Sequence, residues 1–268
     1  MRGLLIYDEA GYGRNKWFAE RIIESASASG VQIDLVIYDG ECSFDTDVDF
    51  AIVRTIAPSL NECLECHGIP TFNNSRTSLV ANNKWNTYLF AKELGLSVMN
   101  TVKPEKYTDG EKLFGYPFVV KSIDGHGGSE VFLVDNRQKC KELFSNFDIN
   151  RFIAQELSSE PGVDMRVYML GGKVLSAARR SSKTDFRSNF SLGGNAEIVA
   201  VPEDVKAVAE SICRALGCDL VGIDFIPHNG EWILNEIEDV VGTRMLYSLT
   251  DLDAAELYVK YIMNKLNA

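Results

Sequence analysis

The sequence predicts an α/β protein in which a small parallel-sheet domain is followed by two α+β lobes. Three observations support this fold class. Strands and helices alternate over residues 4–53, two apolar strands enclose a glycine-rich segment within residues 117–134, and an acid-bearing hairpin occupies residues 221–239. At 268 residues the chain is long enough for two or three modules that each bury a core.

The first module, predicted to span residues 1–75, has the pattern of a parallel sheet. Apolar strands are expected at residues 4–7, 33–38 and 49–53, with a helix over residues 15–29. The loop over residues 8–13 holds a glycine pair, Gly11 and Gly13, but lacks the third glycine of a dinucleotide fingerprint. We therefore expect a βα loop at the carboxyl edge of the sheet, where a co-substrate could bind.

A single helix is predicted next, from the capping residues 73–75 to about Gly95. It carries Lys84 beside an aromatic stripe, Trp85 and Tyr88, whose helical spacing indicates core packing. Taken alone, Lys84 has the character of a solvated lysine, because charged side chains are mostly exposed.

Residues 76–155, the second predicted module, contain a candidate phosphate site. A strand that ends at Lys121 is followed by a loop with Gly125, Gly127 and Gly128, and then by a second apolar strand. Glycines let backbone N–H groups approach phosphate oxygens, and a lysine at the strand end adds a positive charge. An ordinary glycine hairpin is the alternative, because the spacing differs from that of a P-loop.

Residues 156–268 form the third predicted module. Arg179 and Arg180 end a hairpin, and a polar, glycine-ended loop follows at residues 185–194. Arginines beside such a loop could clamp an anion through paired N–H groups. They are equally compatible with a solvated loop.

Three carboxylates interrupt the apolar pattern of the last hairpin, Asp224 on the first strand and Glu236 and Glu238 on the second. Residues i and i+2 of a strand share a face, and Asp224 joins that face if the loop has an odd number of residues, as a loop over 227–231 would. Carboxylates on one half-buried face repel one another unless a cation neutralises them. Mg2+ is the favoured cation, because it prefers oxygen ligands and is usually shared with substrate phosphates.

Composition excludes several classes of partner. The net charge of −11 argues against a nucleic-acid partner. The start of the chain lacks the pattern of a secretory signal, and no apolar run is long enough to cross a membrane, so we expect a cytoplasmic protein with reduced cysteines. Cys63, Cys66 and His67 have the spacing of a haem attachment site or half of a zinc site, or else mark a helix end with small apolar thiols.

In this order the motifs resemble those of ATP-grasp enzymes, and most of all the RimK-like carboxylate–amine ligases, over residues 68–242. The resemblance implies the ATP-grasp fold, in which two lobes clamp ATP behind an N-terminal α/β domain. It assigns nucleotide contacts to Lys84, Lys121, Gly125, Gly127, Gly128, Gln155, Glu156, Leu157, Asp164, Arg187, Ser188 and Asn189. It assigns the ligands of one or two Mg2+ ions, with Mn2+ as the alternative, to Asp224, Glu236 and Glu238.

The chemistry that the resemblance implies is ligation through an acyl phosphate, in which ATP phosphorylates a carboxylate and an amine then displaces the phosphate. The implied catalytic residues are Lys121, Arg187 and Asn189, and the candidate substrate contacts are Arg179, Arg180 and Arg244. A nearby carboxylate is the alternative partner of Arg244. The expected substrates are a small-molecule or peptide carboxylate and an amine, and the composition is compatible with a homo-oligomer. A phosphotransferase and a nucleotide-binding module without turnover are the alternative functions.

The sequence departs from the family pattern at three places. Glu238 stands where the family usually has asparagine, which adds a negative charge to the metal strand. Residues 240–242 replace a Ser-Pro-Gly segment, and Glu130 replaces a glycine of the flexible loop. These differences concern the co-substrate more than the nucleotide.

Overall fold

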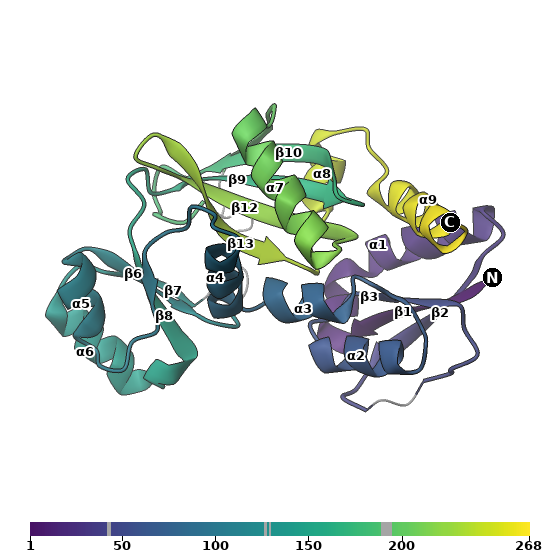
Figure 1. The fold of residues 1–268 in the computed structure, drawn as a ribbon, viewed down its shortest axis with the longest axis horizontal. Helices are drawn as coiled ribbons and strands as arrows, with labels where there is room; N and C mark the ends of the chain where they lie inside the picture. The colour runs from purple at the N-terminus through teal and green to yellow at the C-terminus, as the bar shows by residue number, and fades with distance from the viewer. Residues whose placement is uncertain (42–43, 126–127, 129, 189–194) are drawn as a thin grey trace.

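The computed structural model describes residues 1–268 except 42–43, 126–127, 129 and 189–194. Three sheets are arranged along the molecule (Figure 1). An N-terminal sheet lies at one end, a lid sheet at the other, and a five-stranded central sheet between them. The predicted mixture of a parallel sheet with antiparallel lobes is confirmed.

The N-terminal sheet is parallel, with the strand order β2-β1-β3-β4. Its elements are β1 (Arg2–Asp8), α1 (Glu9–Ala28), β2 (Gln32–Tyr38), β3 (Phe50–Val53), α2 (Pro58–Cys66) and β4 (Thr71–Phe72). Alternate residues of β1 enter different cores, because side chains of a strand point to opposite faces. Leu5 packs with α1 and with Tyr258 of the C-terminal helix, whereas Leu4 packs with Leu60 of α2. The C-terminal helix is therefore part of the N-terminal core.

The first helix begins earlier than predicted. The Asp8 side chain accepts the Gly11 N–H at 2.7 Å and caps α1, so the predicted loop over residues 8–13 forms the start of the helix. The predicted start at Asn15 coincides with a kink, where φ is −125° and ψ is 20°. The prediction was wrong because the glycine pair suggested a loop, whereas the Asp8 cap offsets the low helix propensity of glycine.

Two helices, α3 (Ser75–Ala81) and α4 (Lys84–Glu93), replace the single helix that was predicted. Asn83 interrupts the helical backbone with φ −129° and ψ 107°, and its side chain accepts the Asn86 N–H at 2.9 Å. The break places Lys84 in the first turn of α4. There its backbone N–H donates to the Ile123 carbonyl, beyond the end of a lid strand, at 2.9 Å.

The lid sheet is antiparallel, with the order β5-β8-β6-β7. Its elements are β5 (Thr101–Val102), α5 (Asp109–Phe114), β6 (Phe118–Ser122), β7 (Val131–Val134), α6 (Arg137–Asn146), the 3-10 helix η1 (Ile149–Arg151) and β8 (Phe152–Glu156). A separate core joins Phe118 and Phe152 of the sheet to Leu143 of α6. Sequence patterns did not predict β5 or α5, which are two and six residues long.

The central sheet is antiparallel, with the order β11-β10-β9-β12-β13. The elements of this lobe are β9 (Val163–Leu170), β10 (Lys173–Ser181), β11 (Asn195–Ile198), α7 (Glu203–Leu216), β12 (Leu220–His228), β13 (Glu231–Glu238), α8 (Arg244–Leu249) and α9 (Ala254–Leu266). On β9, Met165 and Val167 pack with Ile212 of α7. Asp164 and Arg166, which alternate with them, lie on the other face.

The register of the last hairpin differs from the prediction. Residues 229–230 form a two-residue turn, with positive φ at Asn229 and Gly230, and not a five-residue loop. A bulge at Asn235 shifts the pairing, so that Asp224 lies opposite Glu236. The bulge supplies the extra residue that was predicted in the loop, and Asp224 shares a face with Glu236 for that reason.

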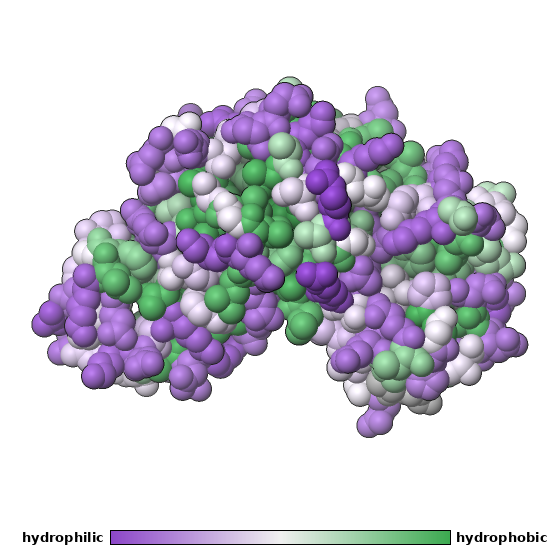
Figure 2. Space-filling model, viewed as in Figure 1, coloured by the Kyte–Doolittle hydropathy of each residue, from purple (hydrophilic) through white to green (hydrophobic). Residues whose placement is uncertain are grey.

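The outline of the molecule is hollowed between the lid lobe and the N-terminal domain, and hydrophobic side chains gather over its middle (Figure 2). None of the helices in the described part of the chain is long and apolar enough to cross a membrane. The domain limits near residues 75 and 155 stay predictions.

Candidate active site

A cleft of about 600 Å³ opens between the lid sheet, the central sheet and the start of α1. Its volume is in the range of small-molecule sites in proteins. The cleft brings together most of the predicted site residues, namely Lys84, Lys121, Gly125, Gly128, Gln155, Glu156, Leu157, Asp164, Arg180, Arg187, Ser188, Asp224, Glu236, Glu238 and Arg244. Gly127 and Asn189 lie outside the described residues.

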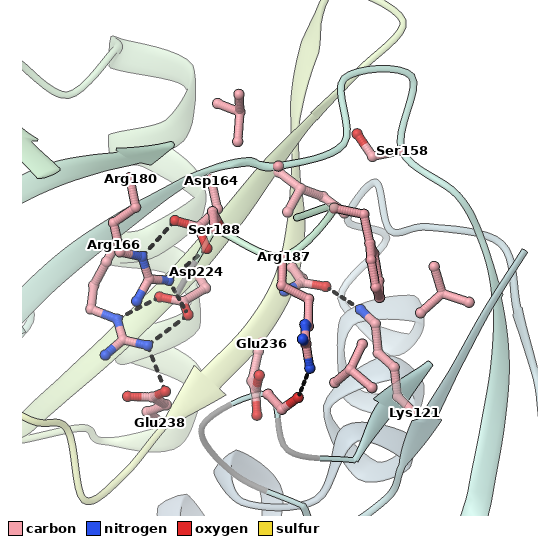
Figure 3. Close-up of a pocket in the computed structure, with 18 of the residues that line it drawn as sticks. Lys121, Ser158, Asp164, Arg166, Arg180, Arg187, Ser188, Asp224, Glu236 and Glu238 are labelled. Carbon is pink, nitrogen blue, oxygen red and sulfur yellow. Dashed lines mark hydrogen bonds and ion pairs between the residues drawn. The ribbon is translucent and has the colours of Figure 1, made fainter. Parts of the chain in front are cut away.

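Two arginines and three carboxylates form a network on the cleft face of the central sheet (Figure 3). Arg166 of β9 donates to both carboxylate oxygens of Asp224, at 2.8 and 2.7 Å, and to Glu238 at 2.5 Å. Arg180 of β10 donates to both oxygens of Asp164, at 2.5 and 2.7 Å, and to Asp224 at 2.9 Å. The side chains meet because all five residues occupy cleft-facing positions of neighbouring strands.

The network separates the pKa values of its carboxylates. Burial alone raises the pKa of Asp224, but the charges of Arg166 and Arg180 outweigh burial and hold that pKa well below its ordinary value. For Glu238 burial prevails over the attraction of Arg166, and the pKa is raised. Burial likewise raises the pKa of Asp164 despite its contacts with Arg180.

Arg166 was missed by sequence reasoning, which expected a metal ion to neutralise these carboxylates. In the structure a guanidinium group does so for Asp224 and Glu238. A signal was present, because Asp164 and Arg166 are polar residues two apart in an otherwise apolar strand. Charged residues so placed require partners across the sheet.

Two lysines face the network from the lid side. Lys84 is 8% exposed, and its ammonium group lies 3.0 Å from a carboxylate oxygen of Glu236 and donates to the Gly125 carbonyl at 2.5 Å. The interpretation of Lys84 as a solvated side chain was therefore wrong. Lys121 donates to the Gln155 side-chain oxygen at 2.6 Å and to that of Asn235 at 2.8 Å.

Lys121 donates to neutral oxygens and to no carboxylate of the described residues, so little offsets the effect of burial on its pKa. Burial lowers the pKa of Lys121 to about 8, and the nearby carboxylate of Glu236 offsets the effect only in part. Asn235, which holds this lysine, was also missed. It is the bulged residue of β13, and a bulge cannot be located from apolar periodicity.

The loop that carries Arg187 reaches across to the glycine-rich segment. Arg187 binds both oxygens of Asp185, with a shortest distance of 2.7 Å, and donates to the Gly128 carbonyl at 2.7 Å. Ser188, which is 6% exposed, lies close enough to Asp164 to oppose the rise of the Asp164 pKa. The loop thus connects the lid to the arginine network.

The remaining predicted arginines divide between the cleft and the surface. Arg179 does not line the cleft, and its exposed guanidinium lies 3.4 Å from Glu197 of β11. It points away because it is next to Arg180 on the same strand. Arg244 lines the cleft and donates to the backbone carbonyl of Arg14 at 2.7 Å, and not to a carboxylate as the alternative reading proposed.

The predicted metal ligands offer the right donor chemistry but are engaged with cations of the chain. Glu236 contacts Lys84, Glu238 contacts Arg166, and both oxygens of Asp224 accept from arginines. Among the described residues no group of three or more His, Cys, Asp or Glu side chains is arranged to hold a metal ion. Glu236 and Glu238 share a face of β13 and fit a hard cation, whereas Asp224 fits one only if Arg166 and Arg180 release it.

The cysteine motif lies far from this chemistry in the chain, at the end of α2. His67 follows the helix, and its Nδ1 atom lies 2.8 Å from the Cys63 carbonyl. Cys66 is exposed. The helix end expected from the third interpretation is confirmed, but the packing of its thiols is not, because Cys63 is half-buried and Cys66 exposed.

The fold and the cleft define the class of an ATP-grasp ligase, and comparisons with known proteins agree. A RimK-like ATP-grasp domain matches residues 81–262. The chain is 27% identical over 270 residues to the uncharacterized protein MG011 homolog of Mycoplasma pneumoniae, covering 97% of this chain and 91% of that relative. It is 25% identical over 277 residues to the probable alpha-L-glutamate ligase of Methanococcoides burtonii, covering 93% and 92%.

Among solved structures, D-alanine–D-alanine ligase from Bacillus anthracis superposes with a TM-score of 0.79 at 15% identity, covering 100% of this chain and 97% of that one. This likeness shows the fold. The chain belongs to the RimK-like ATP-grasp family. The resemblance inferred from the sequence motifs is confirmed.

Proposed function

We propose that the protein uses ATP to activate a carboxylate as an acyl phosphate and joins it to an amine, with release of ADP and phosphate. One observation carries the proposal most directly. Lys121 of the lid sheet and Lys84 of α4 enter the cleft beside β13, where Lys121 donates to Asn235 and Lys84 is 3.0 Å from Glu236. Cations that face carboxylates within one cleft are suited to a triphosphate and its counter-ion.

The two lysines would bind phosphate groups of the nucleotide. Each now makes contacts that an anion can replace, since Lys84 donates to a backbone carbonyl and Lys121 to two amide oxygens. The burial that lowers the pKa of Lys121 strengthens its attraction for a phosphate once it is protonated, because the local dielectric is low. Backbone groups of residues 155–157 would contact the base, and Asp164 would contact the ribose.

A divalent ion bound in the cleft would neutralise phosphate charge during transfer. Glu236 and Glu238 are the residues that would hold it, with Asp224 as a third ligand once its arginines move. The carboxylate of Asp224 otherwise keeps Arg166 and Arg180 in position.

Arg187 would stabilise the transferring phosphoryl group. Its guanidinium contacts Asp185 of its own loop, which follows β10, and the Gly128 carbonyl of the glycine-rich segment, and so links the two. Donors fixed in place before reaction are the largest source of electrostatic catalysis in many enzymes. The lid would also exclude water, which otherwise hydrolyses an acyl phosphate.

Amino acids or peptides are the proposed substrate class. The support is that the similar proteins include a probable alpha-L-glutamate ligase and a D-alanine–D-alanine ligase, whose names specify amino acids.

A screen for phosphate release over paired carboxylate and amine candidates tests the proposal. We expect release to require both partners and Mg2+, and mass spectrometry to find the amide. Glu236→Gln should lower turnover about a hundredfold, as does loss of a preorganised electrostatic partner. Glu231→Gln is the matched control, because Glu231 is exposed at the other end of the same strand.

Other outcomes would select other functions. A stable phosphorylated product formed without any amine would identify a phosphotransferase. Binding of ATP without phosphate release for any pair would identify a nucleotide-binding module.

A further inference from the structure

Five arginines line the cleft, and they fall into two groups. Arg166, Arg180 and Arg187 each form bidentate ion pairs with an aspartate. Arg14 and Arg244 are exposed, and neither has a carboxylate within 4.0 Å among the residues that the structure describes. Their charge is therefore available to a ligand.

These two arginines belong to different parts of the fold but meet at one end of the cleft. Arg14 is in α1 of the N-terminal domain, and Arg244 is the first residue of α8. Both helices lie on the side of the molecule opposite the lid sheet (Figure 1). Lys121, one of the proposed phosphate ligands, comes from the lid sheet, so Arg14 and Arg244 mark the other end.

A specific contact joins the pair. The Arg244 Nη2 atom donates to the backbone carbonyl of Arg14 at 2.7 Å. That carbonyl precedes the kink of α1 at Asn15, whose backbone is non-helical. The kink thus lets the N-terminal domain anchor the side chain of Arg244 beside Arg14.

Among the residues that the structure describes, no carboxylate forms an ion pair with Arg14 or Arg244. Asp8 feels the charge of Arg14, which helps to lower the Asp8 pKa, but its oxygens accept the Gly11 N–H at 2.7 Å and the Thr55 hydroxyl at 2.9 Å. It caps α1 and fixes Thr55. Arg14 and Arg244 are like charges that line the same cleft and are joined by the backbone contact at Arg14, and an anion bound there would be attracted by both.

We propose that Arg14 and Arg244 bind a substrate carboxylate that is not consumed in the reaction, and so select substrates that carry one. This inference rests on the proposed ligase function. The paired N–H groups of arginine match the two oxygens of a carboxylate. A second phosphate is disfavoured because the proposed phosphate ligands, Lys84 and Lys121, lie elsewhere in the cleft and contact β13. The group could belong to the activated acid or to the amine, and the experiment distinguishes them.

The kinetic test compares each candidate with its amide. On the activated-acid side the pairs are glutamate against glutamine, and on the amine side a dipeptide with a free C-terminus against its C-terminal amide. We expect the wild type to prefer the free acid on one side only, which identifies the source. Arg14→Gln and Arg244→Gln should each raise KM for that acid at least tenfold, as loss of a charge-assisted hydrogen bond implies, and leave KM for ATP unchanged.

Two variants control for indirect effects. Arg214→Gln removes an exposed arginine of α7 outside the cleft and should change neither KM. Arg244→Lys keeps the charge and should recover part of the loss. A double variant, Arg14→Gln with Arg244→Gln, that still prefers the free acid as the wild type does would overturn the proposal.

A binding test separates this proposal from the ligase function. Phenylglyoxal modifies accessible arginines, and peptide mass spectrometry measures modification at each position. We expect glutamate or the free dipeptide, but not the amides, to protect Arg14 and Arg244 in the protein with ADP and Mg2+. Protection without turnover would support the carboxylate site and refute the ligase. Lack of protection by any free acid would refute the carboxylate site even if turnover is found.

Discussion

The arginine network of the central sheet and the lysine pair of the lid side both place cations against carboxylates, but they do so differently. Arg166 and Arg180 make several short contacts each, including a bidentate pair, and both are less than 9% exposed. Lys84 makes one ion pair, and Lys121 donates only to amide oxygens. The first arrangement neutralises itself, whereas the second leaves positive charge for a ligand.

This difference predicts that the network determines stability and that the lysines determine binding. Partners in a buried, fully paired network cannot be removed singly without leaving a charge unmatched. A lysine held by neutral oxygens loses little when those contacts are exchanged for phosphate. Substitutions in the two regions should therefore separate the two properties.

The largest expected effect is on stability, from Asp224→Asn. Asp224 receives hydrogen bonds from both arginines, and its loss leaves their charges incompletely compensated in a buried site. We expect the free energy of unfolding to fall by about 3 kcal/mol, measured by urea denaturation. Glu236→Gln should cost less, because Glu236 has one lysine contact, glutamine keeps an oxygen that can accept from Lys84, and Lys84 also donates to the Gly125 carbonyl. Equal losses for the two variants would contradict the proposed division.

The second effect is on binding, from Lys121→Met. We expect affinity for ADP to fall roughly a hundredfold in calorimetric titration, because a buried charge opposite the phosphate is lost. The free energy of unfolding should change less than for Asp224→Asn, since methionine relieves the cost of burying an ammonium group. A loss of stability without a loss of ADP affinity would show that Lys121 stabilises the fold and does not bind the nucleotide.

The acidity of Lys121 provides a third test, in which binding and stability change in opposite directions. Its pKa is lowered by burial to about 8 in the folded protein, against 10.5 ordinarily. The unfolded chain therefore binds more protons across that window, and stability should rise as pH increases from about 8 toward 10.5. Affinity for ADP should fall over the same range, by up to about tenfold per pH unit.

The control is Lys121→Arg, because arginine stays protonated throughout. Its ADP affinity should vary less with pH above 8 than that of the wild type. An identical pH profile would show that another group titrates.

Sequence reasoning predicted much of this site because the patterns involved are local. Lys121 ends an apolar strand before a glycine-rich loop, and Glu236 and Glu238 alternate with apolar residues, so spacing alone places each on its element. The order of these patterns then indicated the family. Such inferences need no knowledge of which strands are neighbours.

What could not be predicted depends on pairing between strands. The partners of Asp224 come from β9 and β10, and contacts across a sheet are not visible in one strand. The bulge at Asn235 has no periodic signal, yet it sets both the register of Asp224 and the contact to Lys121. The predicted helix limits were wrong for a local reason. The capping side chains of Asp8 and Asn83 start helices at positions where helix propensity did not predict a start.

The smallest expected effect comes from Arg179→Gln, and it sharpens the comparison because the neighbouring residue is part of the network. The Arg179 side chain is 41% exposed and lies 3.4 Å from Glu197, and such solvent-accessible pairs contribute little to stability. We expect a change within about 0.5 kcal/mol in the free energy of unfolding and no change in ADP affinity. Arg180→Gln should instead destabilise the protein by about 3 kcal/mol, since it leaves Asp164 buried without its bidentate partner. If denaturation curves of the two variants coincide, side-chain alternation along β10 does not decide which arginine supports the cleft.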